Sequence, residues 1–538
     1  IYSYSAPYGD SLLHPELDPY PDGLLDRLAE RGIGGVWLPV WLCTLMPWEP
    51  DPAISAGWET RQDNLRRLAA RVADHGLGLL LYLNEPRAVP THSRTFEVRP
   101  EWRGLEYPDW GLVSLCTSQP GVLDWVREGA ATVFREAPRL AGVFTITMSE
   151  SPTHCHSRWR GRECPRCAAR PPAELAAEVN RAVASGVWSA RPDARVIAWT
   201  WAWDAAWELE AVDRLPAGVE VMAVSEWGLP LRAGPDAPAL VDYSISRVGP
   251  SDRARAGWRR ARDRGLKAVA KVQINCSWEL SNVPWIPAPD LVARHLAALR
   301  AEGVSGLMLS WTVGGYPGGN LDLLDRSPDE LAPRLYGAAA APLVREAWRR
   351  FSLAFEHFPF SCAVIYNAPH NTGPANLLFP RPTGYRATMV QGLPYDDLQG
   401  WRDFYSEDEF EDRFRRVAEG WAEGLTWLAR ARQAAAPDPA HAAALEELER
   451  VAIAAHCHFR SAWNQVVYVR RRGDPAPGAR AALARILRDE MKLAKRLRAC
   501  MRRDSRLGFE AANHYAFTQN DLMEKALNCR DLLNRSWE

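Results

Sequence analysis

A regular alternation of two hydrophobic patterns is the feature that most constrains the fold of this chain. Across the first 325 residues, short apolar runs alternate with amphipathic stretches whose leucines recur at three- and four-residue spacing. The runs occupy residues 1–5, 34–40, 77–83, 142–148, 195–203, 219–225, 268–274 and 306–311. The pattern therefore predicts about eight strands, each followed by a helix.

This repetition predicts parallel strands joined by right-handed helical crossovers. A closed sheet of this kind is a (β/α)8 barrel and an open one is doubly wound. No GxGxxG follows the first of the internal runs, which disfavours a dinucleotide-binding fold. We predict an α/β protein, with a TIM barrel over residues 1–325 and an all-α C-terminal domain over residues 326–538, where long helical patterns dominate.

Composition excludes several classes of protein. The 65 basic and 66 acidic residues leave a net charge of -1 without a basic stripe, so we expect no nucleic-acid partner. No run of 18 apolar residues occurs, so we expect no membrane partner. Ten cysteines are too few for a disulfide scaffold, and no signal-peptide pattern follows Ile1. We expect a cytoplasmic protein, and whether a domain precedes Ile1 is left open.

Carboxylates at the ends of predicted strands are the main candidates for catalysis. Glu150 follows the fourth strand, Glu226 ends the sixth and Glu279 follows the seventh. Glycoside hydrolysis needs two carboxyl groups that flank the scissile bond, one as an acid and one as a nucleophile or base. By analogy with many retaining barrel glycosidases, we assign Glu150 as acid/base and Glu279 as nucleophile, with Glu226 as the alternative partner.

Aromatic and polar residues near the same strand ends are candidates for substrate binding. The 24 tryptophans suit stacking on sugar faces, although most are expected in the core. Strand alternation would place Trp201 and Trp203 on one face, and a glycine-rich turn follows Trp311. The predicted substrate-binding residues are Arg87, Trp201, Trp203, Trp311, Tyr316, Asn320, His514 and Tyr515. Packing or ion pairing is an alternative role for each.

A cysteine- and histidine-rich segment follows Glu150 at residues 154–167. It contains His154, Cys155 and a CxxC pair formed by Cys164 and Cys167. Three thiolates and one imidazole suit tetrahedral zinc, and four protein ligands imply a closed, structural site. We predict a structural Zn2+ here and no organic cofactor. A redox CxxC and free thiols are the alternatives.

The chain resembles bacterial glycoside hydrolases of the family 20-like, hexosaminidase-related group at Glu150, at residues 311–317 and in its helical tail. The resemblance covers the predicted barrel and implies a carbohydrate substrate. It also departs from that family, whose members carry an Asp-Glu pair after the fourth strand. Ser149 precedes Glu150 here, so a two-carboxylate mechanism is the more natural inference than substrate-assisted chemistry.

The sequence therefore predicts a glycosidase that cleaves a terminal sugar from a glycan or glycoside, with retention. Two alternatives are a β-N-acetylhexosaminidase with a substrate-assisted mechanism and a non-catalytic carbohydrate-binding barrel. A metal-dependent hydrolase and a structural protein are further rivals. The helical tail also suggests a homo-oligomer. The sugar, the linkage, the anomeric configuration and exo or endo action are not readable from the sequence.

Overall fold

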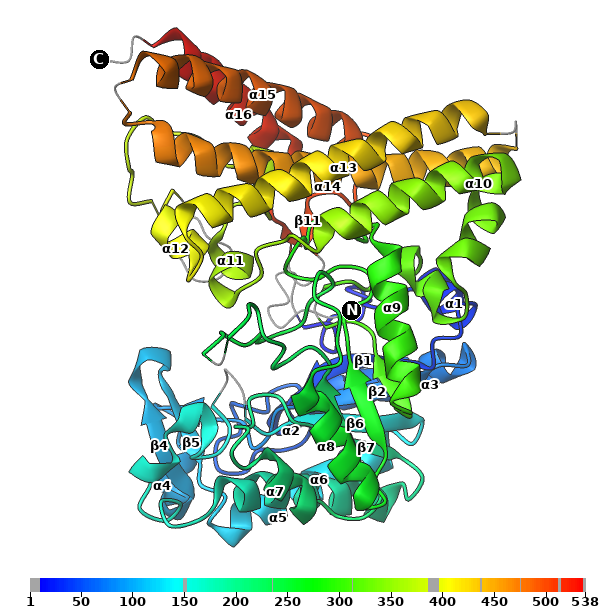
Figure 1. Cartoon of the computed structure of the whole chain (residues 1–538). Coiled ribbons are helices and arrows are strands. Elements are labelled where there is room, and N and C mark those ends of the chain that lie inside the picture. Colours follow the sequence, from blue (N-terminus) through cyan, green and yellow to red (C-terminus); the bar gives the residue numbers. More distant parts are fainter. Residues whose placement is uncertain are drawn as a thin grey trace. The chain divides into compact units, whose positions relative to one another are not determined.

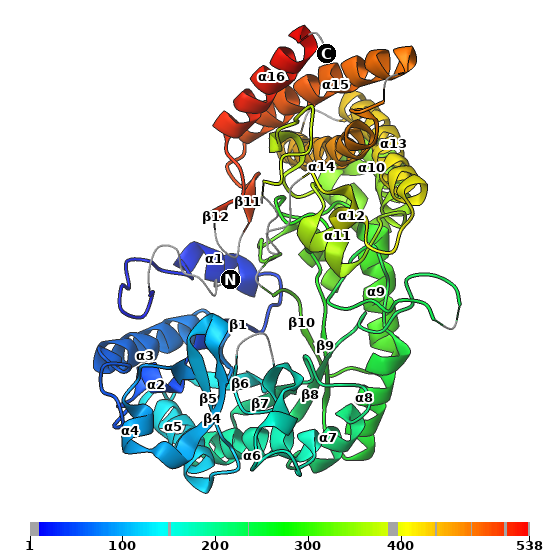
Figure 2. The ribbon, with the colours of Figure 1, turned by 90° about the vertical axis from the view of Figure 1, so that its left-hand side faces the viewer.

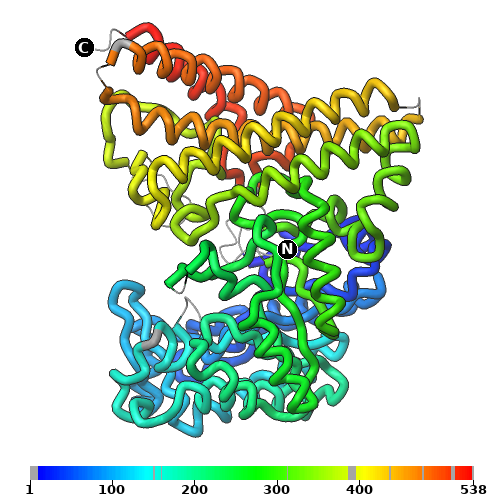
Figure 3. Tube along the Cα trace, in the orientation of Figure 1, coloured from blue at the N-terminus to red at the C-terminus, as the bar shows by residue number. Residues whose placement is uncertain are grey.

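The computed structural model describes residues 10–148, 152–234, 236–311, 313–385, 396–435, 438–474, 476–510 and 514–535 (Figure 1). The chain forms two compact units, each built from three segments. Unit 1 comprises residues 1–225, 251–271 and 302–308, and unit 2 comprises residues 226–250, 272–301 and 309–538. Figure 3 traces the path of the backbone through these segments. Among the described helices, none is long and apolar enough to span a membrane.

A curled sheet of seven parallel strands forms the centre of unit 1. Its spatial order is β1-β2-β6-β7-β8-β9-β10, which follows the order of these strands in the sequence. The strands are β1 (Gly35–Val40), β2 (Gly78–Leu83), β6 (Leu140–Ile146), β7 (Arg195–Trp199), β8 (Glu220–Val224), β9 (Ala268–Lys271) and β10 (Gly306–Met308). All pairs being parallel, the carboxyl ends of the strands meet at one edge of the sheet.

The crossover helices of unit 1 pack against one another in chain order, α3 on α5, α5 on α6, α6 on α7 and α7 on α8 (Figure 2). Their apolar positions recur at helical spacing, so each buries one face. The helices of this unit are α1 (Asp22–Ala29), α2 (Leu42–Leu45), α3 (Trp58–Asp74), α4 (Thr95–Val98), α5 (Pro120–Glu136), α6 (Pro172–Ala190), α7 (Glu208–Arg214) and α8 (Asp252–Asp263), with 3-10 turns at Pro100–Trp102, Pro108–Trp110, Ser157–Trp159 and Gly161–Glu163.

A small antiparallel sheet is inserted between β2 and α5. It contains β3 (Val89–Pro90), β4 (Arg103–Tyr107) and β5 (Leu112–Leu115), in the order β3-β5-β4. The glycine at position 111 has a φ of 61°, and it forms the turn between β4 and β5. This sheet was not predicted from the sequence, because its strands are short and carry no strong alternation.

Long helices make up most of unit 2, and they pack in the order α10, α13, α14, α15, α16 (Figure 1). Gly337 interrupts α10 with a φ of 77°. The elements are α9 (Pro289–Ala301), α10 (Pro328–Phe355), α11 (Cys362–Asn367), α12 (Leu398–Arg402), α13 (Glu407–Ala434), α14 (Pro439–Arg471), α15 (Pro477–Met501) and α16 (Gln519–Asn534), the hairpin β11 (Phe509–Glu510) and β12 (His514–Tyr515), and 3-10 turns at Gly319–Leu324 and Gly373–Ala375.

Aromatic rings and one buried ion pair hold these helices together. Phe351 of α10 stacks on Trp421 of α13 with ring centroids 4.8 Å apart. Lys525 of α16 pairs with Glu490 of α15 at 2.8 Å, and neither side chain is exposed. Glu490 also accepts a hydrogen bond from Ser461 of α14 (2.8 Å), so three helices share one satisfied polar centre.

The structure confirms the α/β class, seven of the predicted strands and the helical C-terminal region. The predicted first strand, residues 1–5, lies outside the described residues, and the sheet is a half-barrel among those that are described. A closed eight-stranded barrel therefore stays a prediction. So does the domain boundary after residue 325, which falls inside the last segment of unit 2.

The contact between α5 and α6 leads to a stability prediction. A Cβ at Gly186 in α6 would overlap the carbonyl oxygen of Arg127 and lie 3.0 Å from the Cβ of Ala130, both in α5. We expect Gly186→Ala to lower the free energy of unfolding by about 1–3 kcal/mol, because backbone must move.

Gly257 in α8 is the matched control, since its Cβ would meet nothing within 4 Å. Gly257→Ala should raise stability by roughly 0.5–1 kcal/mol through backbone entropy. Urea denaturation of both variants checks the pair. Equal effects would contradict the close packing of α5 on α6.

Candidate functional site

Glu150, the predicted acid/base, lies outside the described residues, so its geometry is not part of the site described below. The other predicted site residues are divided between the two units. Arg87, Trp201 and Trp203 belong to unit 1, whereas Glu226 and Glu279 belong to unit 2. Each unit is therefore considered by itself.

Residues that follow β1 and β2 form a polar and aromatic cluster at the carboxyl edge of the sheet in unit 1. Trp41 comes directly after β1 and is 44% exposed, although most large aromatic residues are buried. The guanidinium of Arg87 lies over its ring at 4.7 Å and donates a hydrogen bond to Asn84 (2.7 Å). An exposed indole beside a guanidinium offers a stacking surface with a nearby donor.

Glu85 connects the loops that carry Trp41 and Arg87. Its Oε1 accepts a hydrogen bond from the N–H of Leu42, and its Oε2 accepts one from the N–H of Arg87, both at 2.8 Å. Burial raises the pKa of Glu85 to about 7, and the two N–H donors and the Arg87 charge oppose that rise. The carboxyl group therefore titrates near neutral pH. Glu85 was not among the predicted site residues, because burial is not visible in the sequence.

Trp201 and Trp203 lie beyond the end of β7, although the predicted fifth strand included both. The strand β7 stops at Trp199, and Ala202 has a φ of 60°, so the alternation expected through residue 203 does not occur. Trp203 is buried and donates its indole N–H to Thr147 (3.0 Å). Trp201 is half-buried and its ring lies 5.6 Å from that of Trp199. Trp201 therefore offers more surface to a ligand than Trp203.

Glu279 is fully buried in unit 2 and surrounded by hydrogen-bond donors. Its Oε1 accepts from the hydroxyl of Ser244 (2.7 Å) and the N–H of Ser246 (3.2 Å). Its Oε2 accepts from the N–H of Ile245 and the hydroxyl of Ser277, at 2.7 and 2.6 Å. Each carboxylate oxygen has two lone pairs, and each of the four lone pairs has a hydrogen-bond donor. This side chain holds the loop at residues 244–246.

Glu226 lies next to the same loop. Its Oε1 accepts a long hydrogen bond from the N–H of Ser244 (3.5 Å), and the Nδ1 of His295 lies 3.8 Å away. Burial lowers the pKa of His295 to about 4, so the imidazole is neutral at pH 7 and the pair is not ionic. Ser244 therefore contacts both candidate carboxyl groups of unit 2, Glu226 through its N–H and Glu279 through its hydroxyl.

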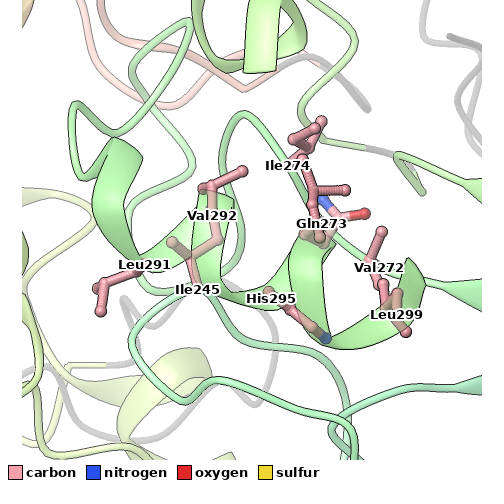
Figure 4. A pocket seen from close by; sticks show the side chains of 9 residues that line it. Ile245, Val272, Gln273, Ile274, Leu291, Val292, His295 and Leu299 are labelled. Atoms are coloured by element: carbon pink, nitrogen blue, oxygen red, sulfur yellow. The ribbon is translucent and has the colours of Figure 1, made fainter. Parts of the chain in front are cut away.

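His295 also lines a small cavity of unit 2 (Figure 4). Apart from His295 and Gln273, its lining is aliphatic. The lining residues are Ile245, Val272, Gln273, Ile274, Leu291, Val292, His295, Leu296 and Leu299. A sugar needs several convergent hydrogen-bonding groups, so this cavity is poorly suited to one.

Hydrogen bonds to residues 273–286 hold the glycine-rich turn that follows Trp311, which was predicted to bind substrate. The backbone N–H of Trp311 donates to Gln273 (2.6 Å). Asn320 is buried and its side-chain amide donates to the carbonyl oxygens of Ile274 and Ile286, both at 2.9 Å.

Tyr316 is similarly engaged. Its ring stacks on Trp285 with centroids 5.3 Å apart, the Arg506 guanidinium lies over it at 4.8 Å, and its hydroxyl donates to Glu447 (3.0 Å). These contacts account for the polar groups of Tyr316 and Asn320. Their contact with a substrate stays a prediction, as does that of Trp311.

His514 and Tyr515 form β12, which pairs with β11. The Tyr515 hydroxyl donates to the carbonyl oxygen of Ser505 (2.6 Å), and its side chain is 42% exposed. The structure thus places Tyr515 on a short hairpin that precedes α16. A role in substrate binding stays a prediction for both residues.

Three of the four predicted metal ligands are brought together in unit 1. The sulfur atoms of Cys155, Cys164 and Cys167 cluster with that of Cys116, and all four atoms lie within 4.8 Å of one another. His154 is not a member of this group; its Nδ1 accepts a hydrogen bond from the N–H of His156 (3.2 Å). Cys116 follows β5 and was missed, because it is distant in sequence from the CxxC pair.

Comparisons with known proteins relate the fold, but not the sequence, to characterised enzymes. No protein-family model and no curated protein matches the sequence. A GH138 enzyme targeting pectin rhamnogalacturonan II aligns with a TM-score of 0.56 and 11% identity, over 95% of this chain and 62% of its own.

A GH89 enzyme from Clostridium perfringens, in complex with its substrate GlcNAc-alpha-1,4-galactose, aligns with a TM-score of 0.55 and 12% identity. The alignment covers 99% of this chain and 62% of that one. The chain thus spans about three-fifths of the length of these two structures. They show that its fold is one used by glycoside hydrolases.

The pKa of Glu85 predicts how stability varies with pH. The folded protein keeps a proton on Glu85 up to about pH 7, whereas the unfolded chain loses it near 4.5. Between these values the free energy of unfolding should fall as the pH rises, by up to about 1.4 kcal/mol per pH unit from this group. Glu85→Gln cannot ionise, so its dependence on pH should be flatter.

Urea denaturation between about pH 5 and about pH 7 measures this slope. Glu97→Gln is the matched control in the same unit, because Glu97 is largely exposed. The control should keep the slope of the parent protein. An unchanged slope in Glu85→Gln would show that Glu85 is ionised throughout.

Proposed function

We propose that the chain is a glycoside hydrolase that removes a terminal sugar from a glycan or glycoside. The observation that carries this proposal is the fold similarity to two glycoside hydrolases over nearly the whole chain. The exposed Trp41 and the adjacent Arg87, at the carboxyl edge of a parallel sheet, support it, because this edge is where such folds bind ligands.

The proposed mechanism uses two carboxyl groups with retention of configuration. Glu150 protonates the glycosidic oxygen as the bond to the anomeric carbon breaks, and a second carboxylate attacks that carbon. Glu150, now ionised, then takes a proton from the water that releases the sugar. Its place in the sequence, four residues after the end of β6, motivates this role.

Glu226 is the better candidate for the second carboxylate. A nucleophile must direct a lone pair at the anomeric carbon, whereas four donors already use the lone pairs of Glu279. We therefore propose Glu279 as a positioning residue that holds residues 244–246 beside Glu226. The alternative is the pairing of Glu150 with Glu279, and an experiment must distinguish it from the pairing with Glu226.

The identity of the sugar is a separate question. The substrate of the GH89 enzyme contains GlcNAc in α-linkage, which supports an N-acetylhexosaminide as substrate but not the β-configuration of the hexosaminidase alternative. The family 20-like resemblance itself stays a prediction, and Ser149 speaks against its substrate-assisted mechanism. We propose Trp41, Trp201 and Arg87 as sugar contacts. A homo-oligomer formed through the helical region and a cytoplasmic location also stay predictions.

A panel of aryl α- and β-glycosides tests the activity. It should include N-acetylglucosaminides and be supplemented with rhamnogalacturonan II oligosaccharides. We expect Glu150→Gln to lower kcat by about 10²- to 10⁴-fold while sugar binding persists, because proton transfer is lost.

Glu136→Gln at the exposed end of α5 is the matched control and should keep full activity. A fully active Glu150→Gln protein would contradict the mechanism. Sugar binding without turnover by the parent protein would favour the non-catalytic carbohydrate-binding barrel.

Azide separates the roles of the carboxylates on a substrate that the panel identifies. Removing a nucleophile leaves space in which azide attacks the anomeric carbon directly, which gives a glycosyl azide of inverted configuration. We expect this product from Glu226→Ala and the product of retained configuration from Glu150→Ala. Product configuration is read by NMR, with folding checked by thermal melting.

Glu279→Ala should give no glycosyl azide of inverted configuration and should melt at a lower temperature, because the buried donors of residues 244–246 lose their acceptor. The inverted product from Glu279→Ala, and not from Glu226→Ala, would instead identify Glu279 as the nucleophile.

A further inference from the structure

Four buried sulfur atoms in unit 1 form a compact group that the proposed glycosidase mechanism does not use. The side chains of Cys116, Cys155, Cys164 and Cys167 are all at most 2% exposed, and all four are free thiols. Their sulfur atoms lie within 4.8 Å of one another. Four thiols rarely gather in a core for packing alone, because their reactivity rather than their volume decides where they are used.

The distances between these sulfur atoms suit a tetrahedral metal ion. Cys116 lies 3.9 Å from Cys164 and 3.6 Å from Cys167, sulfur to sulfur. Zinc–sulfur bonds of about 2.3 Å in a tetrahedron place the sulfur atoms about 3.8 Å apart. A disulfide would bring two of them to about 2.05 Å. The observed separations match the edges of a metal site and exclude a bond between these pairs.

We propose that Cys116, Cys155, Cys164 and Cys167 bind one zinc ion in a closed, structural site. Thiolate ligands in a tetrahedral arrangement favour zinc. Four protein ligands leave no open coordination position, so the ion does not activate water. The ligand set differs from the one expected from the local sequence, since Cys116 takes the fourth position and His154 has none.

Neighbouring donors complete the site. Zn2+ with four thiolates carries a net charge of -2, which burial makes costly unless donors address the sulfur atoms. The Nε of Arg166 donates to the sulfur of Cys116 (3.3 Å), and the hydroxyl of Ser118 lies 3.2 Å from the sulfur of Cys167. Arg166 lies within the CxxC pair, so one short segment supplies two ligands and a compensating charge.

The site joins two segments that are far apart in the sequence. Cys116 directly follows β5, the middle strand of the inserted sheet, whereas the other three ligands lie in the loop after β6. This loop has little regular structure, and its sequence begins next to Glu150. Two hydrogen bonds run between the same segments, from Tyr107 to the carbonyl oxygen of Ser157 (3.2 Å) and from Arg160 to that of Glu106 (2.9 Å). The zinc ion anchors the loop to the inserted sheet.

Metal analysis of the whole chain tests the proposal. After production with zinc and removal of loosely bound metal, elemental analysis should find about one zinc per chain. Cys116→Ser should lose most of this zinc, whereas His154→Ala should keep it. Cys276→Ser is the matched control, because Cys276 is a buried cysteine outside the cluster, and it should keep the zinc as well.

Cobalt substitution of the parent protein gives a spectroscopic readout of the ligands that does not depend on a cysteine variant. Co2+ at the site should show visible absorption of tetrahedral cobalt and strong sulfur-to-metal charge transfer, unchanged by His154→Ala. Metal-free protein with four reactive thiols would overturn the proposal, as would bound iron. Zinc retained by Cys116→Ser but lost from His154→Ala would overturn the ligand set. None of these results depends on glycosidase activity, so the two proposals fail separately.

Discussion

Parallel pairing of the seven strands is the constraint on which the rest of unit 1 depends. A parallel strand can follow its neighbour only through a crossover, and the crossovers here are the helices that cover the sheet. The same pairing gathers every strand's carboxyl end at one edge. Trp41 follows β1, whereas Asn84, Glu85 and Arg87 follow the neighbouring strand β2, and they meet because of this pairing. The clustered polar residues are thus a consequence of the topology.

The sequence predicted the strands of the parallel sheet, but not the inserted sheet or the end of the fifth strand. Apolar runs separated by amphipathic helices are a strong signal, and seven of them became parallel strands. The inserted sheet was missed because β3, β4 and β5 are too short to show a hydrophobic pattern of their own. The fifth strand was predicted to extend to residue 203, but it ends at Trp199. Nothing in the sequence TWAW reveals the positive φ of Ala202. Local patterns specify elements, whereas their ends depend on tertiary packing.

The candidate site could be predicted by residue type but not by role. Cys155, Cys164 and Cys167 were found from their spacing, whereas Cys116 approaches them only through the fold of the inserted sheet. The sequence favoured Glu279 over Glu226 as the second carboxylate, and the four donors around Glu279, which support a positioning role for it, depend on the tertiary fold. Burial is the main cause of the raised pKa of Glu85, and burial is not visible in the sequence.

The interleaving of the two units has a consequence for how the chain is made. Strand β10, which completes the described sheet of unit 1, comes after two segments that belong to unit 2. A ribosome must therefore release all residues through Met308 before that sheet is complete, so the N-terminal unit cannot finish folding first as tandem domains do. Until then the edge of β9 is left without its partner strand. Such an edge is a pairing site for other chains, so nascent copies need protection at this stage.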